Sequence, residues 1–177
     1  MSIELLELGA AELGEIADDV VFVGGATVPL WITDPAAPPP RPTKDVDVIV
    51  EVATHAEYHA FEARLRDAGF RGDEEIICRW HMRESGLVLD AMPTEVAVLG
   101  FENTWQREAF PHSVEVELAS GVGIRAVPPA FLLATKLEAH QGRGEGDLLG
   151  SRDLRTSSRW LTGGRSSSPK CERRRGA

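Results

Sequence analysis

Residues 21–50 read VFVGGATVPLWITDPAAPPPRPTKDVDVIV, a stretch in which a glycine pair and a proline-rich loop join two apolar strands. Side chains two apart on a strand point to the same face of a sheet. Asp45 and Asp47 at the start of the second strand therefore share one face, and Val46 and Val48 share the other. The pattern predicts a strand with one packed face and one acidic face.

The two carboxylates predict a cation site. Like charges on one face repel each other and lose solvation when they are partly buried, so a cation between them stabilises the arrangement. Oxygen ligands at this spacing suit Mg2+, which takes its other ligands from water and phosphate oxygens. Gly24 and Gly25 have no Cβ, so the backbone can approach a ligand, and amides at the start of a following helix can hold an anion. Together these features predict a nucleotide site.

Gly24-Gly25, then a spacer, then Asp45-Val46-Asp47 on a strand resembles the motif of the nucleotidyltransferase superfamily, which includes polymerase-beta-like and aminoglycoside-modifying enzymes. The longer string PTKDVDVIVEV (42–52), with TKLEA (135–139) and RDL (152–154), is similar to the AbiEii/AbiGii-type abortive-infection toxins. The resemblance covers residues 20–154. One departure is that the gap between the glycines and the acids is longer than usual and rich in proline.

The resemblance implies an α+β fold, with helices packed against a mixed β-sheet. It implies an enzyme that uses Mg2+ to move a nucleoside monophosphate from an NTP to an acceptor hydroxyl. For the toxin branch, the acceptor would be tRNA or a protein, and a cognate antitoxin would be a partner. Nothing in the sequence selects the acceptor.

Asp90 is the candidate third carboxylate. It lies in LVLDAM (87–92), the second strand of a predicted hairpin of residues 76–82 and 86–92. In the family pattern, an acid at this place is a metal ligand and a general base for the attacking hydroxyl. The alternative is an acid at a strand end that faces water. The apolar neighbours Val88 and Leu89 favour the catalytic interpretation, because an unpaired acid on a buried strand would be costly.

Lys136 and Asp153 complete the predicted nucleotide site. Lys136 lies in FLLATKLEAH (131–140), which Pro128 and Pro129 open as a helix. The resemblance implies that this lysine contacts the phosphates of the nucleotide, and the alternative is a solvated lysine paired with Glu138. Asp153 corresponds to an acid that supports the site in the family.

The remaining elements follow from periodicity and capping. Apolar residues at helical spacing predict a first helix over residues 3–17. A short helix is predicted over 26–31, and the clearest helix covers 54–68, where Thr54 and Glu57 form a capping box. Alternating residues predict a second strand pair, 114–118 and 122–127, about Ser120-Gly121.

Composition and charge narrow the class of protein. The formal net charge is −9 over 177 residues, but residues 155–177 carry seven Lys or Arg and one Glu, a balance of +6 that leaves −15 on residues 1–154. An acidic body is a poor general binder of nucleic acid. The sequence has no apparent signal peptide or membrane span, and its two cysteines do not require an oxidising compartment, so we expect a cytoplasmic protein.

The character of the chain changes after Leu154. We expect residues 1–154 to form the nucleotidyltransferase-like domain and residues 155–177 to be an aberrant basic tail. One interpretation is a disordered tail. Another is a frameshift, because codons permitted for residues 154–167, read from the last base of the Leu154 codon, encode Glu-Asp-Ile-Ile-Ala-Val-Ala-Asp-Gly-Arg-Ser-Glu-Leu. The C-terminal helical part would then be incomplete. Because that part would support the site, the alternative function is a non-catalytic nucleotide- or partner-binding remnant.

Overall fold

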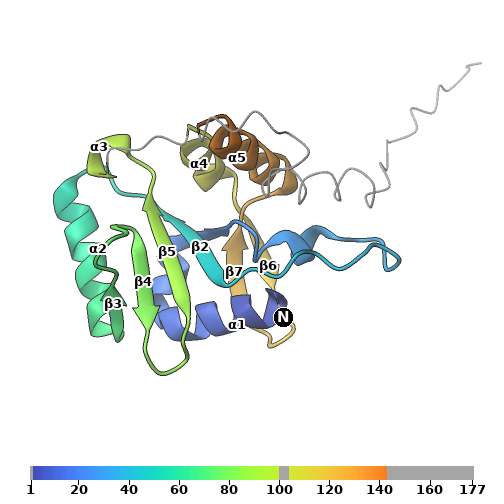
Figure 1. Ribbon diagram of the computed structural model, residues 1–177, viewed down its shortest axis with the longest axis horizontal. Helices are drawn as coiled ribbons and strands as arrows, with labels where there is room; N and C mark the ends of the chain where they lie inside the picture. Colours follow the sequence, from blue (N-terminus) through green and yellow to red (C-terminus); the bar gives the residue numbers. More distant parts are fainter. Residues whose placement is uncertain (1, 100–103, 143–177) are drawn as a thin grey trace, which may run out of the picture.

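The computed structural model describes residues 2–99 and 104–142, which form a mixed sheet with helices on both faces (Figure 1). The strands are β1 (Val20–Val23), β2 (Asp45–Val50), β3 (Phe70–Gly72), β4 (Arg79–Met82), β5 (Val88–Pro93), β6 (Val114–Glu117) and β7 (Gly123–Ala126). The α-helices are α1 (Ser2–Leu13), α2 (His55–Asp67), α3 (Val96–Leu99), α4 (Thr104–Ala109) and α5 (Pro129–Gly142). Short 3-10 helices are η1 (Gly14–Asp19), η2 (Val28–Trp31) and η3 (Phe110–His112).

The sheet has seven strands in the order β3-β4-β5-β2-β1-β7-β6. The two strands that flank the proline-rich loop, β1 and β2, are antiparallel neighbours at its centre. Beside them, β2 runs parallel to β5 and β1 runs parallel to β7. The sheet is therefore mixed, and the predicted α+β class is confirmed.

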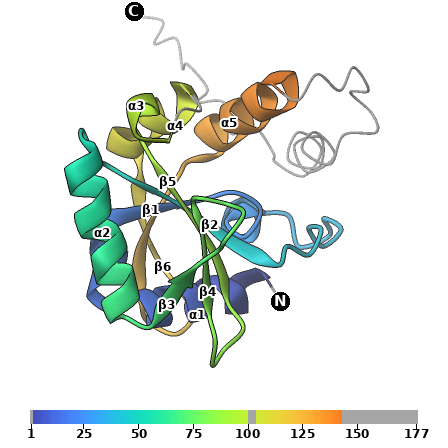
Figure 2. The same cartoon turned by 60° about the vertical axis from the view of Figure 1, so that its left-hand side comes forward.

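The two faces of β2 pack against different helices. Val46, Val48 and Val50 are buried in the larger core cluster, to which α1 and α2 contribute. Ile49 faces the other way and joins a smaller cluster that includes residues of α4 and α5. Figure 2 shows α2 on one side of the strands and α5 on the other. Asp45 and Asp47 alternate with the valines, so they share the face of α5.

The helices mostly follow the sequence pattern. The capping box of α2 is confirmed, because Thr54 Oγ1 accepts from the Glu57 amide and the Glu57 carboxylate accepts from the Thr54 amide. Helix α1 is shorter than the predicted helix over residues 3–17. It ends at Leu13 because Gly14 has a φ of +54°, which breaks the α-helical path, and the chain continues as η1. The helix predicted from Phe131 is α5, and the one predicted over 26–31 is the shorter η2.

The first hairpin differs from the prediction at its beginning. Residues 76–78 are not part of the strand, because Asp73 Oδ1 accepts hydrogen bonds from the amides of Glu75 and Ile76 and closes a turn there. The strand β3, which pairs with β4, was not predicted. Alternation over only three residues is too short a pattern to identify a strand. The second predicted pair is confirmed as β6 and β7.

Some sequence predictions lie outside the described residues. These are Asp153, the tail over residues 155–177, and the helices that a restored frame would add. Within residues 2–99 and 104–142, no helix is long and apolar enough to cross a membrane.

Candidate functional site

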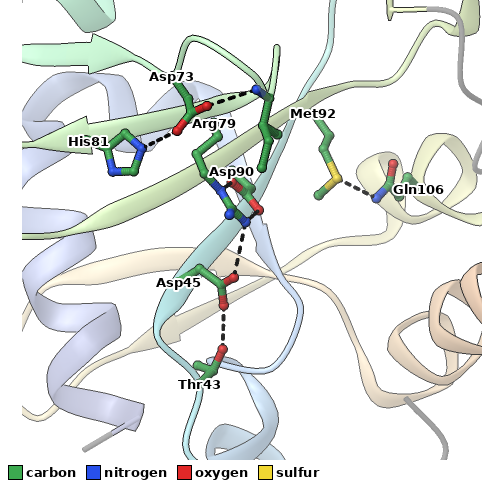
Figure 3. Close-up of polar contacts among 9 residues, drawn as sticks. Thr43, Asp45, Asp73, Arg79, His81, Asp90, Met92 and Gln106 are labelled. Carbon is green, nitrogen blue, oxygen red and sulfur yellow. Dashed lines mark hydrogen bonds and ion pairs between the residues drawn. The ribbon is translucent and has the colours of Figure 1, made fainter. Parts of the chain in front are cut away.

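The three predicted acids lie together on one face of the sheet. In the parallel ladder of β2 and β5, Asp47 is paired directly with Asp90, and Asp45 is two residues before Asp47 on the same strand. Paired residues on neighbouring strands point to the same face. The apolar side chains Leu89 and Ala91, which flank Asp90, are buried in the opposite cluster. Asp45 and Asp90 lie close enough that one side chain contacts both (Figure 3).

Asp47 is the most perturbed carboxyl of the group. Burial, followed by the negative charges of Asp45 and Asp90, raises its pKa to about 7. Lys136 and a hydrogen bond from the Gly25 amide act in the opposite direction. A partly buried acid beside two other acids is costly to ionise, so a cation at this place would be favoured.

Gly24 is required for Asp47 to reach this position. Gly24 has a φ of +79°, and a Cβ built on it would overlap the Oδ2 atom of Asp47. The hydroxyl of Thr27, which is fully buried, donates to the carbonyl of Gly24 at 3.0 Å and holds the turn. The sequence suggested that Gly24 leaves room for a phosphate. In the structure, the missing side chain leaves room for the Asp47 carboxylate, and the contact of Gly24 with a phosphate stays a prediction.

Gly25 and Thr43 bring the end of the proline-rich loop to the site. A Cβ on Gly25 would lie 3.3 Å from the Cβ of Thr43, so the two residues are in close contact. The Thr43 hydroxyl donates to Asp45 Oδ1 at 2.6 Å. Thr43 thus fixes the orientation of Asp45, and this residue was not among the predicted site residues. Its place two residues before Asp45 on an extended segment was the available signal.

Arg79 on β4 is a second residue that the sequence analysis missed. Its Nε donates to Asp90 Oδ1 at 2.8 Å, its Nη2 donates to Asp90 Oδ2 at 2.7 Å, and the same Nη2 lies 3.6 Å from Asp45 Oδ2. The antiparallel ladder pairs Arg79 directly with Asp90. Both residues were on the predicted hairpin, but the pairing depends on the turn, which the sequence pattern does not determine.

Lys136 reaches the same face from α5. Leu132, one turn earlier, is buried against the second cluster and anchors the helix. Lys136 is close enough to Asp47 that its positive charge lowers the pKa of that carboxyl. Glu138, the alternative partner for this lysine, accepts from the amides of Thr104 and Trp105 at the start of α4. The structure therefore brings together all the predicted site residues that it describes.

The donor set fits a divalent cation only in part. Asp45 and Asp47 offer carboxylate oxygens on one face, which is the ligand type that Mg2+ prefers. Asp90 already binds Arg79 through both oxygens. In the described part of the chain, no three His, Cys, Asp or Glu side chains are arranged to hold a metal. The residues fit an ion held by two carboxylates rather than three.

Two cavities lie away from these acids. One, of about 470 Å³, is lined by Val50 at the far end of β2 together with residues such as Phe61 and Arg125. The other, of about 580 Å³, lies along β6 and β7 and shares Arg125. Neither is lined by a predicted site residue, so the acids on β2 and β5 remain the candidate site.

The fold is similar to those of solved structures that include a nucleotidyltransferase-like protein and an antibiotic-resistance factor. An antigenic nucleotidyltransferase-like protein from Paracoccidioides brasiliensis matches with a TM-score of 0.56 and 18% identity, over 91% of this chain and 75% of its own. The solution structure of the antibiotic-resistance factor ANT(2'')-Ia matches with a TM-score of 0.53 and 17% identity, over 90% and 82%. Its crystal structure with adenylyl-2''-tobramycin matches with a TM-score of 0.52 and 17% identity, over 90% and 87%.

At the level of sequence, no family model matches the chain, and neither does any curated protein. The structural matches nevertheless show that the chain has the fold that its resemblance to the nucleotidyltransferase superfamily implied. The narrower resemblance to AbiEii-type toxins has no support from these matches and stays a prediction.

Proposed function

We propose that this chain is a Mg2+-dependent nucleotidyltransferase that transfers a nucleoside monophosphate from an NTP to an acceptor hydroxyl. The observation that carries the proposal is the placement of Asp45, Asp47 and Asp90 on neighbouring strands of this fold, on one face and beside Gly24. The raised pKa of Asp47 supports a cation at this place, because a bound cation would favour its ionised form.

Each residue has a proposed role. Asp45 and Asp47 would hold the Mg2+ ion, which would offset charge on the triphosphate oxygens when it is bound. Lys136 would contact the phosphates from α5, because its charge is close enough to lower the pKa of Asp47. Asp90 would accept the proton of the attacking hydroxyl, and pyrophosphate would leave from the α-phosphate. Gly25, whose amide bonds to Asp47, would lie next to the phosphates, and Asp153 would support the site.

We further propose that the enzyme is a cytoplasmic toxin of an abortive-infection or toxin-antitoxin system, with tRNA or a protein as the acceptor and a cognate antitoxin as its partner. The support is the sequence similarity of residues 42–52 and 135–139 to AbiEii-type toxins. A small polyhydroxylated acceptor is the comparison to include in any assay, because the ANT(2'')-Ia structure contains adenylyl-2''-tobramycin.

One observation favours a second candidate, a non-catalytic nucleotide- or partner-binding remnant. Arg79 occupies both oxygens of Asp90, the residue to which the catalytic proposal assigns the proton. A remnant would retain this ion pair as a structural contact and bind nucleotide without transferring it.

The test is transfer of labelled NTPs, in the presence of Mg2+, to bulk RNA, to protein and to tobramycin. The chain is compared with a version whose frame is restored after Leu154, and with Asp45→Ala in the active version. Asp67→Ala is the matched control, because Asp67 is exposed at the end of α2. Transfer that Asp45→Ala abolishes and Asp67→Ala preserves would support the enzyme. Nucleotide binding without transfer to any acceptor by either version would favour the remnant.

A further inference from the structure

Arg79 is the one basic side chain in direct contact with the acids of the candidate site, among the residues that the structure describes. It lies on β4, next to β5, and its side chain is 27% exposed, whereas that of Asp90 is 14% exposed. The contact is therefore partly buried. An ion pair in such a place is screened less by solvent than one on the open surface.

Two hydrogen bonds join Arg79 to Asp90. The Nε and Nη2 atoms of Arg79 donate to separate oxygens of Asp90 at 2.8 and 2.7 Å, which is the bidentate arrangement that fixes a carboxylate in one plane. The guanidinium keeps its positive charge throughout the physiological range. Asp90 thus has a permanent positive partner within the protein.

Asp45 is placed differently. Its Oδ1 accepts from Thr43 at 2.6 Å, and its Oδ2 is 3.6 Å from Arg79 Nη2, which is longer than a hydrogen bond. A carboxylate has about four lone-pair positions, so Asp45 retains free capacity toward the open face. Figure 3 shows the guanidinium between Asp90 and Asp45, on the side of the site that is away from Thr43.

We infer that Arg79 is the resident counter-ion of Asp90, a positioning residue that restricts the site to one divalent cation held by Asp45 and Asp47. This inference rests on the proposed function. It deepens that function, because Asp90 is then not a metal ligand and its negative charge is neutralised by Arg79 instead of by a cation. A second cation could reach Asp90 only by breaking the bidentate pair, which would leave the partly buried Arg79 without its partner.

The measurement is a titration of the full chain with Mn2+ alone, in which unbound Mn2+ is followed by electron paramagnetic resonance. Four proteins are compared, namely wild type, Arg79→Gln, Arg83→Gln and Asp90→Asn. Arg83 is the matched control, because it is an exposed arginine in the turn that follows β4 and its change removes the same charge. We expect one Mn2+ per chain for wild type, Arg83→Gln and Asp90→Asn, and a second Mn2+ for Arg79→Gln.

Two further variants make the result specific. Adding Asp90→Asn to Arg79→Gln should remove the second Mn2+, because the freed carboxylate is what binds it. Arg79→Lys keeps the charge and should bind one Mn2+. If Arg79→Gln unfolds, Asp90→Asn still tests the inference, because loss of the bound Mn2+ from that variant would make Asp90 a metal ligand. Thermal unfolding of each variant shows whether it is folded. The inference is overturned if Arg79→Gln is folded and titrates like Arg83→Gln, or if Asp90→Asn loses a Mn2+ that wild type binds.

The same experiment separates this inference from the proposed function. If wild type binds one Mn2+ that Asp45→Ala removes, and Arg79→Gln adds none, the metal site stands and the role of Arg79 fails. If wild type binds no Mn2+ but Arg79→Gln binds one that Asp90→Asn removes, the counter-ion role stands and the metal-dependent function fails. If neither protein binds Mn2+, both are overturned.

Discussion

At the scale of single residues, the site depends on how closely a few side chains approach one another. Asp47 lies against the Cα of Gly24, is paired with Asp90 and is influenced by Lys136. Each of these residues restricts the others, because the carboxylate can occupy this place only where no Cβ fills it. The consequences of single substitutions should therefore be larger here than elsewhere on the surface.

Gly24→Ala should destabilise the protein and displace Asp47. The new Cβ would overlap the carboxylate, and the left-handed backbone adds a strain of about 1 kcal/mol. Gly121→Ala is the matched control, because Gly121 has a similar φ of +83° with no atom within 4 Å of its Cβ position. Urea unfolding should show that both variants are less stable than wild type. Mn2+ binding should be lost in Gly24→Ala alone. Equal effects of the two changes on both measurements would contradict this explanation.

Asp47 should make the metal-free protein less stable as pH rises from about 4 to about 7. Its folded pKa is raised to about 7, so across this range the folded state holds a proton that the unfolded state has lost. Stability therefore falls with pH, by at most about 1.4 kcal/mol per pH unit from this group. Above pH 7 the contribution is constant.

The comparison is Asp47→Asn in EDTA, followed by urea unfolding at a series of pH values. The amide cannot ionise, so the variant should gain stability relative to wild type as pH rises through this range. An unchanged difference between pH 4 and pH 8 would show that Asp47 is not responsible.

At the scale of elements, capping and packing place the site. Helix α2 begins at its capping box and covers the face opposite the acids, while α5 covers part of the acidic face. Glu138 links α5 to the first two amides of α4, so these helices are held together. The position of Lys136 therefore depends in part on contacts between α4 and α5 that involve none of the acids of the candidate site.

Thr54→Ala should lower the free energy of unfolding by about 1 kcal/mol, because the Glu57 amide at the start of α2 loses its acceptor. Thr54→Ser keeps the oxygen and serves as the control. Urea unfolding measures both. Because α2 packs on the other face, Mn2+ binding should be unchanged in either variant, and a loss of binding in Thr54→Ala would indicate that α2 affects the site directly.

At the scale of the whole molecule, ligand binding should stabilise the fold, because a formed site binds its ligand only in the folded state. With Mg2+ and an NTP at about 100 times the dissociation constant, we expect the melting temperature to rise by about 5 to 10 °C. Asp45→Ala should remove the rise and Asp67→Ala should not. Differential scanning calorimetry with Mg2+ alone, with NTP alone and with both shows how much each ligand contributes to the rise in melting temperature. No rise with any ligand would mean that the isolated chain has no formed site.

Local sequence patterns predicted most of the elements. The alternation in DVDVIV (45–50) predicted that Asp45 and Asp47 share a face, and the capping box predicted the start of α2. Less regular segments were missed. The strand predicted over residues 76–82 begins only at Arg79, because the Asp73 carboxylate closes a turn before it. Helices α3 and α4 were not predicted, because both are too short to show a period.

From the sequence, the period of the strand predicted that Asp45 and Asp47 share one face of β2, because such periods are local properties of the chain. The α+β class and the candidates Asp90 and Lys136 came from the resemblance to the nucleotidyltransferase superfamily. Only the tertiary structure decided that Arg79 binds Asp90 and that Gly24 makes room for Asp47. The reason is strand register, since a shift of one residue between β4 and β5 would turn Arg79 to the opposite face from Asp90. That register depends on the turn and on packing between distant segments, which no local pattern encodes.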